Sequence, residues 1–74
     1  MLRTKFRLLR VIQEVGGRHH TFVSEIDDTL TPEQRLTVGP PDSTLQIWID
    51  KPEVYGMFVV GQCYYFDTTI TPAE

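Results

Sequence analysis

The sequence predicts an all-β fold, a small five-stranded antiparallel barrel of the SH3-like or OB-like type with one short helix before the last strand. Apolar and polar residues alternate in residues 4–8, 44–50 and 63–68, which is the pattern of strands buried on one face. Glycines and prolines between these segments mark turns. The connections leave no room for the crossovers that parallel strands require, so we expect an antiparallel arrangement.

The first two strands are expected over residues 4–15 and 18–26. The alternation slips in the first strand, because Arg10 falls where an apolar residue is due, and a bulge near Leu9 and Arg10 would explain the slip. Gly16-Gly17 can adopt positive φ and predicts a tight hairpin turn between the two strands.

The middle of the chain predicts turns and one short strand. Asp27-Asp28 is expected to end the second strand through turn chemistry. Thr31-Pro32-Glu33-Gln34 has the form of a helix start with Thr31 as the cap, but only one turn fits before the β-prone residues 36–38. Residues 39–43 predict a rigid turn, since Pro40 and Pro41 cannot donate to a sheet.

The last third gives the clearest pattern. In the strand expected over residues 44–50, the side chains of Leu45, Ile47 and Ile49 share one face. Pro52 suits the first turn of a short helix capped by Asp50, and Gly56 limits that helix to one or two turns. Gly61-Gln62 then turns into the last strand. In that strand Cys63, Tyr65 and Asp67 are expected to face water and Tyr64 and Phe66 to face the core.

Length and composition indicate one small domain over residues 1–74, with residues 69–74 as a tail. A domain of this size buries only about 60% of the surface of its unfolded chain, so assembly with a partner would add stability. Cys63 is the only cysteine, and no Cys or His spacing is typical of zinc, so neither disulfide, metal nor cofactor is expected. No apolar run approaches the roughly 20 residues of a membrane span, so no membrane partner is expected and the cytoplasm is the expected location.

Charge is distributed unevenly along the chain, whose formal net charge is −3. Residues 1–20 carry five basic side chains and one glutamate, whereas residues 21–74 carry two basic side chains and nine carboxylates. We expect the two segments to be neighbours that screen each other. The alternative is a dipolar surface that orients a partner.

The residues do not predict an enzyme. A nucleophile needs a base within hydrogen-bond reach, and the chain offers only His19, His20 and one thiol. Adjacent strand residues point to opposite faces, so His19 and His20 cannot converge on a catalytic or metal site.

Nucleic-acid binding is expected to be weak if it occurs. Arg3, Lys5 and Arg7 form one stripe at strand spacing and are the candidate phosphate contacts, with Trp48 and Tyr65 as stacking platforms. The acidic balance of the whole domain, with a pI of about 5.2, opposes binding to a phosphate backbone.

Protein contact is the stronger prediction. Trp48 lies on the polar face of its strand, between Gln46 and Asp50, and an exposed Trp is a common interface anchor. We therefore predict an interface formed by Trp48, Gln46 and Tyr65. The alternative interpretation is that Trp48 packs under a loop such as residues 27–36.

The C-terminal half also resembles a family of short uncharacterised phage and prophage proteins. Their sequences run as an alternating strand, Asp-Asn-Pro, a short helix, Phe, Gly, and Tyr-Tyr-Val-Asp-Phe-Thr-Pro-Ala. The matching residues here are Leu45, Ile47, Ile49, Asp50, Pro52, Phe58, Gly61, Tyr64, Tyr65, Asp67, Thr71, Pro72 and Ala73, with a weaker match at residues 5–8. This chain departs from the pattern at Lys51, at residues 39–42 and in the inserted Thr68-Thr69-Ile70.

The resemblance implies a phage or prophage origin and transfers no catalytic or ligand residue. Short phage proteins without enzymatic motifs are mainly virion components, or proteins that bind and block a host protein such as a defence system. The implied partner is therefore protein, either a second copy or another phage or host protein. The implied location is the host bacterial cytoplasm or the assembled virion.

Overall fold

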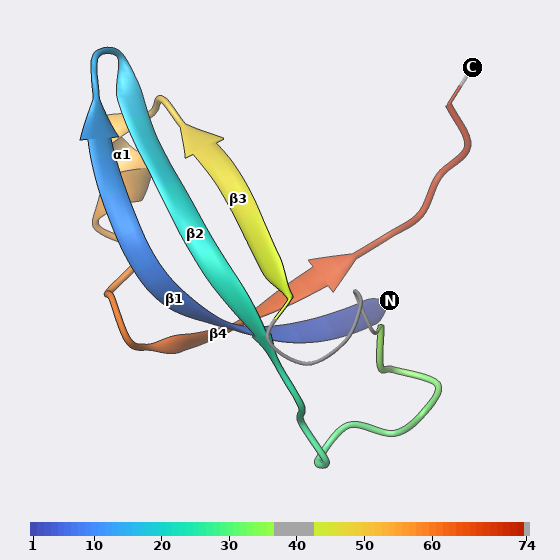
Figure 1. Ribbon diagram of the computed structural model, residues 1–74. Helices are drawn as coiled ribbons and strands as arrows, with labels where there is room; N and C mark the ends of the chain where they lie inside the picture. The colour runs from blue at the N-terminus through green and yellow to red at the C-terminus, as the bar shows by residue number, and fades with distance from the viewer. Residues whose placement is uncertain (37–42, 74) are drawn as a thin grey trace.

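The computed structural model describes residues 1–36 and 43–73 and contains one antiparallel sheet and one short helix (Figure 1). The strands lie in the order β3-β2-β1-β4. The elements in chain order are β1 (Leu2–Glu14), β2 (Gly17–Glu25), β3 (Thr44–Ile49), α1 (Pro52–Tyr55) and β4 (Cys63–Thr68). The all-β, antiparallel prediction is therefore confirmed.

The sheet of the described residues has four strands and is open, with β3 and β4 as its edges. A closed five-stranded barrel is thus not observed in this part of the chain. Leu36 is the first residue of the strand expected over residues 36–38. Its main-chain N–H donates to Arg3 O at 3.0 Å, and the preceding residue, Arg35, forms an isolated parallel bridge with Arg3. Residues 37–38 and most of the turn expected over 39–43 lie outside the described residues.

The β1–β2 hairpin contains the predicted bulge. Leu8 pairs with Phe22 and Arg10 pairs with Thr21, so Leu9 is the extra residue. The bulge restores the inward direction of alternate residues, since Leu8 before it and Val11 after it both contact the core. β1 pairs with a strand on each side, with β4 along residues 2–7 and with β2 along residues 5–14 (Figure 1).

The hairpin turn lies one residue earlier than predicted. Val15 and Gly16 form the turn, with Gly16 at φ 87°, and Gly17 already pairs with Glu14 as the first residue of β2. Only one glycine is thus needed for the backbone of the turn. The second glycine has a different role, which concerns Trp48.

The core lies on one face of the sheet and is largely aromatic. Phe22 contacts Phe58 and Phe66 edge-to-face, with ring centroids 5.4 and 5.0 Å apart. Such pairs contribute about 0.5–1.5 kcal/mol each beyond the area that they bury. The residues buried in this cluster are Phe6, Leu8 and Phe22, and those packed against it are Val11, Leu45, Ile47, Phe58, Tyr64 and Phe66.

The predicted faces of β3 and β4 are confirmed, because Leu45 and Ile47 of β3 and Tyr64 and Phe66 of β4 pack against the core. The helix cap is not as predicted: Lys51, rather than Asp50, is the N-cap of α1, and no side chain caps the helix. Pro52 starts the helix because its missing N–H is not needed there. The Arg18 guanidinium lies over the ring of Tyr55, 4.1 Å from its centroid, and connects α1 to β2.

Residues 26–36 form a loop at the end of the sheet away from the hairpin (Figure 1). The loop contains the predicted single turn, in which Thr31 O accepts from Gln34 N and Arg35 N at 3.0 and 3.1 Å. Main-chain bonds fix the loop to β1, because Arg3 N donates to Gln34 O at 2.7 Å. Residues 69–73 have no regular structure, are exposed, and extend away from the sheet.

Candidate protein interface

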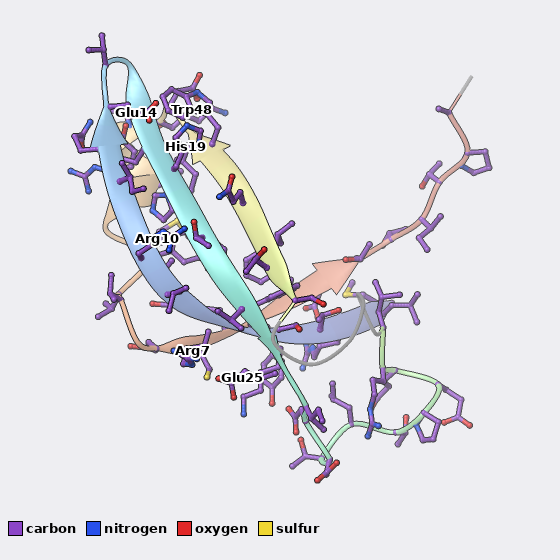
Figure 2. The ribbon with its side chains drawn as sticks, in the orientation of Figure 1. Arg7, Arg10, Glu14, His19, Glu25 and Trp48 are labelled. Atoms are coloured by element: carbon purple, nitrogen blue, oxygen red, sulfur yellow. The ribbon has the colours of Figure 1, made fainter. Side chains whose placement is uncertain are left out.

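Three side chains meet on the outer face of the sheet, opposite the core, at its hairpin end. Ile12 pairs with His19, and His19 pairs with Trp48, so the three lie side by side across β1, β2 and β3. We call them the hairpin-end cluster. Figure 2 shows His19 and Trp48 together near Glu14. The cluster presents an aromatic and an aliphatic side chain to solvent, with Trp48 43% and Ile12 46% exposed.

Trp48 is held in place despite its exposure. Its ring lies 4.8 Å from that of His19, centroid to centroid, at an angle of 57°. The indole also covers Gly17, where an added Cβ would lie 2.5 Å from Trp48 Cζ2. Gly17 is thus needed because Trp48 occupies the space of its side chain. This contact replaces the alternative in which Trp48 packs under the 27–36 loop.

Charged and exposed residues surround the cluster. The His19 Nε2 atom lies 3.3 Å from a carboxylate oxygen of Glu14, an ion pair when the imidazole is protonated. Val15 at the tip of the hairpin is fully exposed. The next row across the outer face contains Arg10 and Gln46, which are exposed, and Thr21 between them, which is buried. The arrangement is an apolar patch with a polar rim, as in the centre of many protein interfaces.

Tyr65 does not join this cluster. It lies on β4, the other edge of the sheet, in the row of Lys5 and Glu25. Glu25 lies six positions from His19 along β2, which corresponds to about 20 Å. Of the three predicted interface residues, the structure therefore brings Gln46 and Trp48 together on β3 and places Tyr65 elsewhere.

Tyr65 instead holds the 26–36 loop. Its hydroxyl donates to Asp27 Oδ2, while the Arg3 guanidinium lies 4.9 Å from the centroid of its ring. The buried Asp27 carboxylate also accepts from the Thr29 hydroxyl and from the Thr29 N–H at 2.9 Å, which is the predicted turn chemistry. These hydrogen bonds lower the pKa of Asp27 from 3.8 to about 2. The bond from the Thr29 hydroxyl has the largest effect, and the bond from Tyr65 has the next largest.

The predicted basic stripe lies on the outer face of β1, but acidic neighbours neutralise two of its members. Arg3 makes a bidentate pair with Asp67 at 2.6 and 3.0 Å, and Arg7 contacts Glu25 at 2.7 Å. The Arg3 bond to Asp67 lowers the pKa of Asp67 and raises that of Arg3. Within the described residues Lys5 and Arg10 are in no ion pair. Two basic side chains of the N-terminal segment, Arg3 and Arg7, are therefore screened by acidic residues from the rest of the chain.

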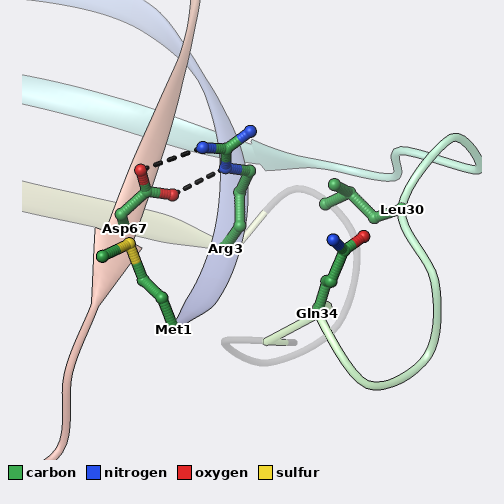
Figure 3. Close-up of a pocket in the computed structure, with 5 residues that line it drawn as sticks. All are labelled: Met1, Arg3, Leu30, Gln34 and Asp67. Carbon is green, nitrogen blue, oxygen red and sulfur yellow. Dashed lines mark hydrogen bonds and ion pairs between the residues drawn. The ribbon is translucent and has the colours of Figure 1, made fainter.

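A small hollow lies beside the Arg3–Asp67 pair (Figure 3). It is open to solvent and has a volume of about 180 Å³, below the roughly 300–1,000 Å³ of typical small-molecule sites. Its two charged side chains, Arg3 and Asp67, bind each other. Its lining residues are Met1, Arg3, Leu30, Gln34 and Asp67.

The two histidines lie on opposite faces, as predicted. His20 is 1% exposed and packs against Phe58 with ring centroids 5.5 Å apart, and its Nδ1 atom has no hydrogen-bond partner. Cys63 is exposed on the edge strand β4. In residues 1–36 and 43–73, no three His, Cys, Asp or Glu side chains are grouped closely enough to hold a metal ion. None of the helices described there is long and apolar enough to cross a membrane.

Sequence reasoning found Trp48 and missed its neighbours. Ile12 follows the bulge, so the face of the sheet to which its side chain points depends on which residue is the extra one. The alternation of apolar and polar residues did not identify that residue. The second glycine of the Gly16-Gly17 pair was the available signal, since a strand glycine often marks close approach of another group.

Comparison of the chain with models of protein families, with curated proteins and with solved structures finds no match.

Proposed function

We propose that this chain is a non-enzymatic protein-interaction module of phage type and that it serves as a virion-associated or assembly component. It binds another protein through the hairpin-end cluster. The observation that carries the proposal is Trp48, a half-exposed indole fixed between His19 and Gly17 on an edge strand. Exposed aromatic residues of this kind are enriched among the anchors of protein interfaces.

The rigid placement of Trp48 favours binding. A side chain already held in one position loses little conformational entropy when a partner covers it.

Phage origin rests on the sequence resemblance. The matching positions are structural in this fold: Gly61 has φ 90°, Pro52 starts α1, and Leu45, Ile47 and Tyr64 pack on the core. We extend the proposal to the finer fold class. The sheet is a partly open SH3-like barrel, because a short helix precedes a last strand that pairs with the first. An OB-like barrel is the alternative.

A second candidate function is an early phage protein that uses the same surface to bind and inhibit a host protein. The identity of the partner separates the two, since a virion component binds phage proteins and an inhibitor binds a host protein. Nucleic-acid binding is a weaker candidate, because Arg3 and Arg7 are engaged with carboxylates.

The test is affinity purification with the wild type, Trp48→Glu and Ile70→Glu from cells that carry the source phage or prophage. Ile70 is an exposed aliphatic residue of the tail, so Ile70→Glu controls for the added charge. We expect one partner to be retained by the control and weakened about 30-fold or more by Trp48→Glu. Circular dichroism should show that both variants keep the sheet. Equal retention of every partner by both variants would reject this interface.

A further inference from the structure

The free edge of β3 has an unusual composition. Its six residues, Thr-Leu-Gln-Ile-Trp-Ile, include no charge and no proline. Edge strands of monomeric proteins are usually protected from pairing by charged side chains, prolines or bulges. The other edge strand, β4, contains Asp67 in its ion pair with Arg3. In the described part of the chain, β3 is thus the edge without such protection.

The hydrogen bonds of β2 show which main-chain groups of β3 face outward. Ser24 N donates to Ser43 O at 2.8 Å, which makes these two residues a hydrogen-bonded pair. Hydrogen-bonded pairs alternate along an antiparallel ladder, so Leu45, Ile47 and Ile49 direct their N–H and C=O groups to β2. The main-chain groups of Thr44, Gln46 and Trp48 therefore point away from the sheet, where another strand could pair with them.

We propose that two copies of the chain pair through this edge, β3 to β3 and antiparallel, about a two-fold axis near Gln46 and Ile47. The proposal rests on the proposed function and names its partner as a second copy. A two-fold axis perpendicular to the sheet places the same strand opposite itself in the antiparallel direction. It also keeps the core faces on one side, so that Leu45, Ile47 and Ile49 of the two copies form one apolar layer.

Charge favours a second copy over a different strand. Each copy supplies a six-residue uncharged strand, so no like charges are brought together along β3. A strand from a different protein that carried charged side chains would place them beside Trp48 and Ile47, which are not charged.

The oligomeric state of Gln46→Pro tests the proposal. Proline removes the outward N–H of Gln46 without removing a bond to β2, and Gln46→Val is the control that keeps this N–H. Light scattering after size exclusion should give twice the 8.6 kDa chain mass for the wild type and for Gln46→Val. Gln46→Pro should weaken the dimer roughly 5- to 100-fold, since the axis removes the donor twice.

Amide hydrogen exchange of the wild type gives a second test that needs no variant. The Gln46 and Trp48 amides should be protected in the concentrated dimer and lose protection on dilution, while those of Leu45 and Ile47 stay protected at both concentrations. A monomer at every concentration, or a dimer whose Gln46 and Trp48 amides exchange freely, would overturn this inference. The chain could instead bind a different protein that Trp48→Glu releases and Gln46→Pro retains. That result would support the proposed function and reject the β3–β3 dimer.

Discussion

At the scale of single residues, Gly17 and Trp48 show how a small side chain on one strand fixes a large one on the next. An alanine Cβ at position 17 would lie 2.5 Å from Trp48 Cζ2 and 2.8 Å from Ile49 O. The second contact is with main chain, so moving the indole would not relieve it. Gly17 therefore determines both the position of the proposed anchor and the β2–β3 spacing.

We expect Gly17→Ala to lower the free energy of unfolding by about 1–3 kcal/mol through overpacking. It should also change the fluorescence of Trp48, the only tryptophan. Gly56→Ala is the matched control, because an added Cβ there meets nothing within 4 Å, and its effect should stay within about 0.5 kcal/mol. Thermal unfolding and emission spectra measure both. A stable Gly17→Ala with native emission would show that Trp48 does not lie over Gly17.

At the scale of elements, alternation was enough to predict β3 and β4 and their buried faces, because each is a short strand with one side in the core. The slip at Arg10 similarly indicated the bulge in β1. What the sequence could not show depended on contacts between distant segments. The Tyr65 bond to Asp27 joins residues 38 positions apart, and nothing local marks it.

The same limit explains the errors at the site. Trp48 and Tyr65 both face outward, as predicted, but strand order puts them on opposite edges, and the sequence predicted no order of strands. Asp50 looked like a cap because it precedes Pro52 closely, yet Lys51 is the residue at the N-cap position. Facing direction is a local property, whereas the grouping of side chains into a site depends on topology.

The 26–36 loop gives an element-scale prediction about pH. The folded pKa of Asp27 is about 2, below its ordinary value of 3.8, because of hydrogen bonds from Thr29 and Tyr65. The ionised Asp27 carboxylate therefore adds its full contribution to the stability of the fold above pH 3.8, the unfolded pKa. This contribution is lost as the pH falls through the folded pKa of about 2. We expect Asp27→Asn to unfold at a lower temperature than the wild type at neutral pH, with the difference closing between pH 3.8 and about 2.

Thermal melts across this pH range measure the effect. Asp28→Asn is the control, since this neighbouring carboxylate receives none of the hydrogen bonds that hold Asp27. Tyr65→Phe should reproduce part of the loss, because it removes the second largest cause of the shift. An Asp27→Asn deficit that stays constant down to pH 2 would mean that its carboxylate is not the group that titrates.

At the scale of the whole molecule, folding brings the basic N-terminal strand beside acidic residues from the rest of the chain. Arg3 meets Asp67, and Arg7 meets Glu25. These pairs are partly exposed, so each adds little stability, typically up to about 1 kcal/mol. Their larger consequence concerns function, because they remove two of the three cations that the sequence offered for phosphate binding.

Weak nucleic-acid binding with a shallow salt dependence is therefore the final prediction. Lys5 and Arg10, which are in no ion pair among the described residues, are the cations available on the outer face. Two phosphate contacts give a slope of about −2 for the logarithm of the association constant against the logarithm of salt concentration. Fluorescence anisotropy with labelled duplex DNA at several salt concentrations measures this slope.

The variants for this test follow from the ion pairs. Reversing Arg3 or Arg7 would leave Asp67 or Glu25 without its partner, so a loss of binding there would also report on stability. Lys5→Gln with Arg10→Gln removes both charges without placing a new carboxylate beside Asp27 or opposite Glu25. Lys51→Gln, at the N-cap of α1, is the control. The double variant should abolish the residual affinity and the control should keep it. Tight binding at physiological salt with a steep slope, unchanged in the double variant, would instead place a nucleic-acid site on another surface of the protein.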